Sequence, residues 1–228
     1  MGIAKLQVKV AHVFTQRCFY LFVSLLALIC AAPFTEELAN GRLILQFVQV
    51  LTLVAAVAAV GRTVMPFVIA MLLGFPPLAL QLAVMWGVDE VGHVAVFTLA
   101  FYVAFYIVAI AYLLRYVFSA DVMTDDKLFG AASGYLMLGI GWAFAYLLVQ
   151  AIIPESFRTA PGAPAHTFFD LLYMSFGVLT SNGPGDVAIA GHKVKALVIL
   201  EQVMGTLFVA ILIARLAGIY PARGSKEA

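Results

Sequence analysis

The stretch that decides the fold is Phe168-Phe169-Asp170-Leu171-Leu172-Tyr173-Met174-Ser175-Phe176-Gly177-Val178-Leu179-Thr180-Ser181-Asn182-Gly183-Pro184-Gly185-Asp186. Its first part is apolar and predicts a short helix, and its second part is a polar loop punctuated by glycine and proline. The stretch lies between the last two long apolar segments of the chain. A bilayer admits irregular backbone only where protein or a water-filled cavity satisfies its polar groups. We therefore expect this loop to line a pathway across a membrane.

The composition is that of an integral membrane protein. Hydrophobic residues make up 64% of the chain and charged residues 11%, and mean hydropathy is +1.05, so most of the surface must face lipid. The formal net charge is only +1 and the basic residues are scattered, which gives no footprint for nucleic acid. Cys18 and Cys30 would lie about 18 Å apart on one helix, too far for a disulfide.

Six apolar segments, each near the ~20 residues that cross hydrocarbon, predict six transmembrane helices. They cover residues 18–34, 43–60, 64–86, 93–118, 131–153 and 196–219. The first follows a basic stretch, as in a signal peptide, but no small-residue cleavage pattern is clear at residues 31–33, so we expect it to be retained. Pro76 and Pro77 remove helix hydrogen bonds and predict a kink or break in the third, with a re-entrant segment as the alternative.

Charge asymmetry between alternate loops predicts the orientation. An even number of helices places both termini on one side, which carries nine Lys and Arg residues against four on the other. The positive-inside rule then puts both termini in the cytoplasm of a multi-pass protein of the inner cell membrane, with the 168–186 stretch opening outward. The fourth helix holds only Arg115 in place of a repeated basic row, so residues 1–118 are expected to form a four-helix membrane domain without a charged voltage sensor.

Short segments around the loop share a pattern with a known family. They are Asp126-Lys127-Leu128-Phe129-Gly130-Ala131, Tyr135-Leu136, Trp142-Ala143, Pro154-Glu155-Ser156-Phe157, Leu200-Glu201 and Ala214-Arg215-Leu216. With the loop, they make the C-terminal part resemble the pore domain of the potassium channel family, in a bacterial branch of ion-channel-domain proteins. In that family two helices flank a pore helix and a filter of the form Thr-Val-Gly-Tyr-Gly-Asp. Here Ser181-Asn182-Gly183-Pro184-Gly185-Asp186 takes the place of that filter, after Thr180.

The resemblance implies an all-α membrane protein with six transmembrane helices, a re-entrant pore helix and a filter loop. It divides the chain into a cytoplasmic linker (119–130), a pore domain (131–220) and a short cytoplasmic tail (221–228). Within the pore domain it implies an outer helix (131–153), a pore helix (167–179), a filter (180–186) and an inner helix (196–219). Because one chain supplies one loop, the family implies a homotetramer in the bilayer. No cofactor is implied beyond permeant monovalent cations, potassium foremost.

The expected electrostatics of the loop favour a cation as the permeant ion. The C-terminus of a pore helix carries a partial negative charge that attracts cations. Gly183 and Gly185 can adopt positive φ, which would let successive carbonyl oxygens point toward an ion in place of its water.

The filter departs from the family at two positions, where Asn182 replaces Val and Pro184 replaces Tyr. Proline has no N–H to donate. The pore-helix positions that hold the Tyr hydroxyl in the family correspond to Met174 and Val178, which offer no such bond. Asn182 either supports the loop from behind or turns its amide into the pore. We expect weaker discrimination of potassium over sodium than in members of the family that carry Tyr.

Several other residues have two interpretations. Glu201 lies inside the last apolar segment, where an unpaired carboxylate is expensive, so it should have a partner or be neutral. It either stabilises the filter or senses protons, or it is a charge solvated near the interface. Gly205 is either a gate hinge or a small residue that admits a neighbour. The small residues at 130–134 permit close helix contact, within one chain or between chains. Arg215 and Tyr220 are expected to anchor the inner helix at the cytoplasmic interface.

The remaining candidates give no chemistry of their own. His166 and His192 flank the loop, where they either respond to pH or are ordinary loop residues. The histidines show no metal-ligand spacing, and no nucleophile, base and orienting residue occur together, so we expect no enzyme activity. The alternative to a conducting channel is a non-conducting subunit or scaffold with the same architecture.

Overall fold

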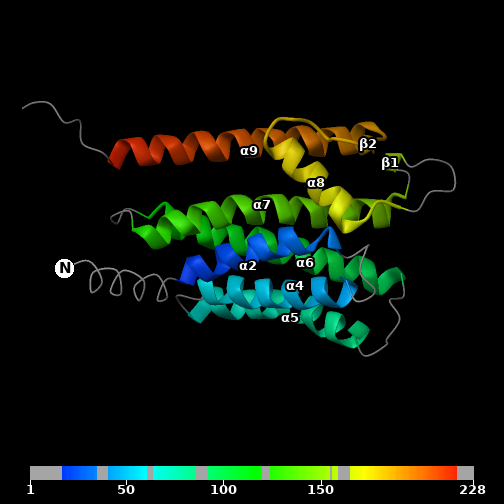
Figure 1. The fold of residues 1–228 in the computed structure, drawn as a ribbon, viewed down its shortest axis with the longest axis horizontal. Coiled ribbons are helices and arrows are strands. Elements are labelled where there is room, and N and C mark those ends of the chain that lie inside the picture. The colour runs from blue at the N-terminus through cyan, green and yellow to red at the C-terminus, as the bar shows by residue number, and fades with distance from the viewer. Residues whose placement is uncertain are drawn as a thin grey trace, which may run out of the picture.

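The computed structural model describes residues 17–34, 41–60, 64–85, 92–119, 124–154, 156–158 and 165–219. The expectations for Tyr220, for the tail and for the basic residues before Arg17 fall outside these ranges. Within them, seven helices and one short two-stranded ribbon are present (Figure 1). The helices are α2 (Arg17–Ala31), α4 (Gly41–Val60), α5 (Val64–Met85), α6 (Gly92–Val117), α7 (Asp125–Ile152), α8 (Phe168–Leu179) and α9 (His192–Ile219).

The helices follow the apolar segments of the sequence. Six of them overlap the six predicted segments, and α8 overlaps the predicted pore helix. Three are long and apolar enough to cross a membrane, over Val94–Val117, Asp125–Ile152 and His192–Arg215. These three support a membrane protein, and the crossing of the membrane by α2, α4 and α5 stays a prediction.

Two boundaries differ from the expected ones. The outer helix begins at Asp125 instead of residue 131, because Thr124 caps it by accepting a hydrogen bond from the Lys127 N–H. Acidic residues at 125 and 126 also stabilise the first turn, because their negative charges lie at the positive end of the helix dipole. Half of the predicted linker is therefore helical. The apolar pattern did not show this, because the first turn of α7 is polar. The first turn of α9 is polar too, and α9 begins at His192, four residues before the predicted start at residue 196.

The third helix is not broken at its two prolines, and the alternative of a kink there stays a prediction. The α-helix α5 continues through Pro76 and Pro77. It packs against α4 and α6, and the Phe105 ring lies 3.3 Å from the position that a Cβ on Gly74 would take. Neighbouring helices of this kind let a membrane helix tolerate the loss of the hydrogen bonds that proline removes.

The helix α7 is the centre of the molecule. The helices α2 and α6 pack on one side of it, with α4 and α5 beyond them, and α8 crosses between α7 and α9 on the other side (Figure 1). Glycines on α7 allow this close packing: Gly130 meets Val117 and Cys18, Gly139 meets the Phe176 ring, and Gly141 meets Tyr106. The small residues of α7 therefore admit neighbours from the same chain.

A ribbon closes the segment that contains α8. Strand β1 (Phe157–Arg158) pairs antiparallel with β2 (Ala188–Ile189), and the Ala190 N–H donates to the Ser156 carbonyl over 2.9 Å. The segment before α8 and the segment after the following loop are thus joined. The loop returns to the end of the molecule from which α8 started.

We predict that Gly139→Ala destabilises the protein, because the added methyl group would lie 2.7 Å from the Phe176 ring. Overpacking of this kind costs about 1–3 kcal/mol, so the thermal midpoint in detergent should fall. Phe176→Leu, which shortens the opposing side chain, should recover part of the loss when combined with Gly139→Ala. Midpoints that add independently in the double variant would contradict this contact.

Candidate functional site: the loop after α8

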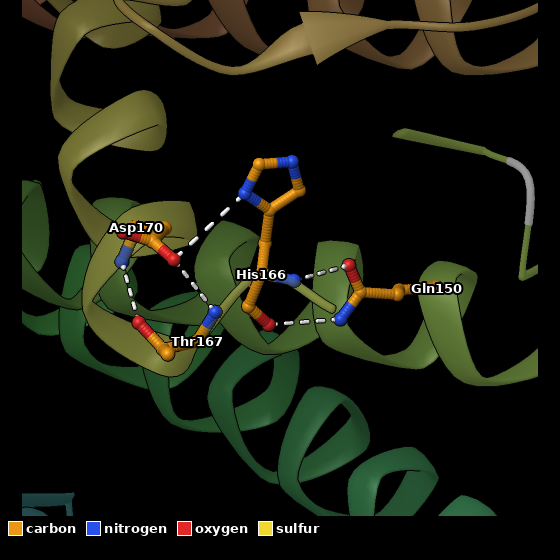
Figure 2. A network of polar contacts seen from close by, with 4 residues as sticks. All are labelled: Gln150, His166, Thr167 and Asp170. Atoms are coloured by element: carbon orange, nitrogen blue, oxygen red, sulfur yellow. Dashed lines mark hydrogen bonds and ion pairs between the residues drawn. The ribbon is translucent and has the colours of Figure 1, made fainter. Parts of the chain in front are cut away.

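The start of α8 is fixed by a capping box. The Asp170 N–H donates to Thr167 Oγ1 over 3.2 Å, and the Thr167 N–H donates to Asp170 Oδ2 over 2.8 Å (Figure 2). Gln150, at the end of α7, holds the preceding residue by donating to the His166 carbonyl and accepting from its N–H. The orientation of α8 is therefore set from α7.

His166 is not an ordinary exposed loop histidine. Its side chain is 17% exposed, and Nδ1 lies 3.8 Å from Asp170 Oδ2 (Figure 2). His192, the first residue of α9, is exposed. A role for either in a pH response stays a prediction.

The end of α8 lies at the middle of α9. A Cβ on Gly205 would collide with the Leu179 carbonyl oxygen, and Gly205 is about 20 Å along the helix axis from the first residue of α9 at 1.5 Å per residue. This contact explains the glycine as a point of close approach. The role of Gly205 as a gate hinge stays a prediction.

The loop folds back onto the last turn of α8. The Gly177 carbonyl accepts hydrogen bonds from the N–H groups of Asn182 and Gly183, over 2.8 and 3.1 Å. The Thr180 hydroxyl donates to the Phe176 carbonyl over 2.7 Å, and Asn182 Nδ2 donates to Thr180 Oγ1 over 3.1 Å. Backbone groups at the helix end thus have partners in the loop.

The backbone of the loop alternates in the sign of φ. Gly183 and Gly185 have φ of +95° and +62°, as their sequence pattern predicted, and Ser181 has φ of +63°. A serine in this region is strained by about 1–2 kcal/mol. No sequence signal marked Ser181 for this conformation.

The Gly183 carbonyl lies against α8. Its oxygen is 2.5 Å from the position that a Cβ on Gly177 would take. The N–H groups of the loop bind the same turn of α8 and draw the backbone onto it. A row of carbonyl oxygens that face an ion stays a prediction.

Polar side chains gather at the end of α8 and on the adjacent face of α9. Thr180, Ser181 and Asn182 are exposed, as are Gln202 and Thr206, one turn apart on α9. Ser181 Oγ lies 3.5 Å from Thr206 Oγ1. The group sits halfway along a helix that can cross a membrane, where polar side chains face water or protein and avoid lipid.

The region behind the loop is apolar. Met174 and Val178 are buried in one cluster with Tyr146 and Val187. The role of Met174 and Val178 as supports of the loop stays a prediction. Pro184 is half-buried, and Asp186 is exposed.

Glu201 has no exposed surface. Tyr146 Oη on α7 lies 2.5 Å from Glu201 Oε2, and Ser175 Oγ on α8 lies 2.5 Å from Oε1. The interpretation of Glu201 as a solvated interfacial charge is therefore wrong. Sequence reasoning predicted that Glu201 needs a partner but not which one, although Ser175 is the one hydroxyl in the buried middle of α8.

Arg215, near the end of α9, bonds to the segment that follows α6. Its Nη2 donates to the Ser119 carbonyl over 2.5 Å. The cytoplasmic anchoring role proposed for Arg215 stays a prediction.

Residues 135–220 match the family model described as ion channel. The match begins within α7 and runs through α8, the loop and α9, so it includes the whole site and leaves α2, α4, α5 and α6 outside. No curated protein and no solved structure matches the chain significantly. The match, which covers less than half of the chain, supports an ion-conducting channel in the lipid bilayer, and the absence of enzyme activity stays a prediction.

We predict that Gly177→Ala displaces the loop, because the new methyl group would lie 2.5 Å from a backbone oxygen that cannot rotate away. Alanine otherwise favours a helix over glycine by about 1 kcal/mol. The control is Gly134→Ala, whose methyl group meets movable side-chain atoms of Leu114 and Phe208. The thermal midpoint should fall more for Gly177→Ala, and the reverse order would contradict the fold of the loop.

Proposed function

We propose that the chain is one subunit of a tetrameric cation channel and that residues 180–186 line the ion pathway near its axis. The observation that carries this proposal is the exposed polar group formed by Thr180, Ser181, Asn182, Gln202 and Thr206 at the middle of α9. Lipid at that depth would offer no hydrogen bond to the polar atoms of these side chains that are not already bonded within the chain. A water-filled path between copies of the chain satisfies them.

The exposed faces of α9 support assembly of several copies. Large apolar side chains such as Ile199, Leu207 and Ile211 are more than half exposed, and within the chain α9 packs mainly on α8. One loop cannot encircle an ion, so a ring needs further copies around a shared axis. Four copies are what the resemblance to potassium channels implies.

Cations are the passengers that the electrostatics favour. The C-terminus of α8, with its partial negative charge, ends beside the polar group. Asp186 is exposed after the loop. Lys193 and Lys195 are exposed at the start of α9, where they would slightly oppose cation entry unless they point away from the pathway.

We predict that Thr206→Cys, in a Cys30→Ser background, makes ion flux sensitive to a positively charged thiol reagent. Thr206 lies on the proposed water-facing side of α9, and Leu207 lies 100° around the helix. Cys30 is exposed and is removed, whereas Cys18 is buried and is kept. Cation flux into liposomes should fall after treatment of Thr206→Cys and not of Leu207→Cys. Equal loss in both, or none in either while flux persists, would contradict the proposed pathway.

The filter differs from that of the resembled family in a way that should weaken selectivity. Pro184 removes one backbone donor per subunit, and Met174 and Val178 form an apolar support in place of polar partners. We propose that potassium and sodium both pass. A strongly potassium-selective reversal potential of the reconstituted protein would contradict this.

We predict that Pro184→Tyr combined with Val178→Thr raises the potassium-over-sodium permeability ratio. The new ring would occupy the family's Tyr position, and the new hydroxyl would lie behind it, where Val178 is now buried. Each single variant is a control, because one change alone lacks its partner. Reversal potentials under bi-ionic conditions give the ratio. An unchanged ratio in a conducting double variant would mean that the alignment with the family filter is wrong.

A non-conducting subunit is the second candidate. The observation that favours it is the Gly183 carbonyl, whose oxygen packs against α8. Flux through liposomes that contain only the purified chain separates the two. Persistent absence of cation flux, with assembled protein present, would favour the second.

A further inference from the structure

The buried carboxyl group of Glu201 joins three helices. It belongs to α9 and contacts Tyr146 of α7 and Ser175 of α8, and all three side chains are fully buried. The described residues give Glu201 these two polar partners, and both are hydroxyls. No basic side chain among them compensates a charge at this site.

Proton counting distinguishes the two states of this carboxyl group. Ser175 Oγ lies within hydrogen-bond distance of two acceptors, Glu201 Oε1 and the Gly139 carbonyl at 2.8 Å. Its single proton can serve only one of them. Tyr146 supplies one proton to Oε2. The hydroxyls of Tyr146 and Ser175 thus supply two protons for three oxygen–oxygen contacts, which are Tyr146 with Glu201, Ser175 with Glu201 and Ser175 with the Gly139 carbonyl. An ionised Glu201 would leave one contact without a hydrogen.

We propose that Glu201 is a neutral carboxylic acid that donates its proton to Ser175. The Ser175 hydroxyl then donates to the Gly139 carbonyl, and the Tyr146 hydroxyl donates to Glu201 Oε2. Every contact has one proton, and no unpaired charge is buried in the middle of a membrane helix. A directed chain of hydrogen bonds thus runs from α7 through α9 and α8 back to α7.

This chain makes Glu201 a positioning residue for the proposed channel, and its role there rests on the proposed function. Ser175 lies two residues before Gly177, whose carbonyl holds the loop. The link therefore fixes the turn of α8 on which the loop folds. The protonation state itself does not depend on conduction.

The first test is the infrared spectrum of the intact reconstituted protein at neutral pH, where exposed carboxyl groups are ionised. The wild type should show a protonated-carboxyl C=O band that Glu201→Gln removes. The matched control, Asp186→Asn, changes an exposed acid and should leave the band in place. Loss of carboxylate bands instead of the C=O band in Glu201→Gln would overturn the proposal.

The second test compares two substitutions of Glu201. Glutamine can donate from its amide to Ser175 and accept from Tyr146, so Glu201→Gln should keep the thermal midpoint and the flux of the wild type. Glu201→Ala removes the carboxyl partner of both hydroxyls and should lower the thermal midpoint and the flux. A Glu201→Gln protein that fails to fold, or that loses as much as Glu201→Ala, would overturn the proposal. A wild type with the band but without flux would overturn the channel function alone.

Discussion

The Gly177 carbonyl is the contact on which the rest of the site depends. It accepts hydrogen bonds from the N–H groups of Asn182 and Gly183, so the chain returns to its own helix end and pairs these backbone groups there. The close return requires glycine at 177, because a side chain there would meet the Gly183 oxygen. It also turns the backbone so that positive φ occurs at alternate residues.

The helix α7 gives this loop a rigid base. Its glycines let Phe176 and Tyr106 approach closely, its last turn holds the start of α8 through Gln150, and its Tyr146 reaches Glu201. In the proposed channel, apolar packing behind the loop and a buried polar link beside it would take the supporting role that an aromatic residue and its hydroxyl partners have in the resembled family.

The hydropathy of the sequence predicted the helices, whereas the features that depend on packing between segments could not be predicted from it. Apolar runs gave the helices, and the glycine–proline pattern located the loop with positive φ at Gly183 and Gly185. The polar first turns of α7 and α9 were missed, because Thr124 and His192 lie outside any apolar window. Continuity of α5 through Pro76 depends on its neighbours. The strained Ser181 and the direction of the Gly183 carbonyl depend on contacts with Gly177 that no local pattern contains.

In the proposed channel, copies of this chain place residues 180–186 around a common axis, and an ion passes among them. A density map of the purified protein in nanodiscs is the decisive measurement. We expect four chains related by a fourfold axis, with these residues innermost and density for ions on the axis. A monomer, or an assembly in which the loop lies at the lipid-facing edge, would contradict it.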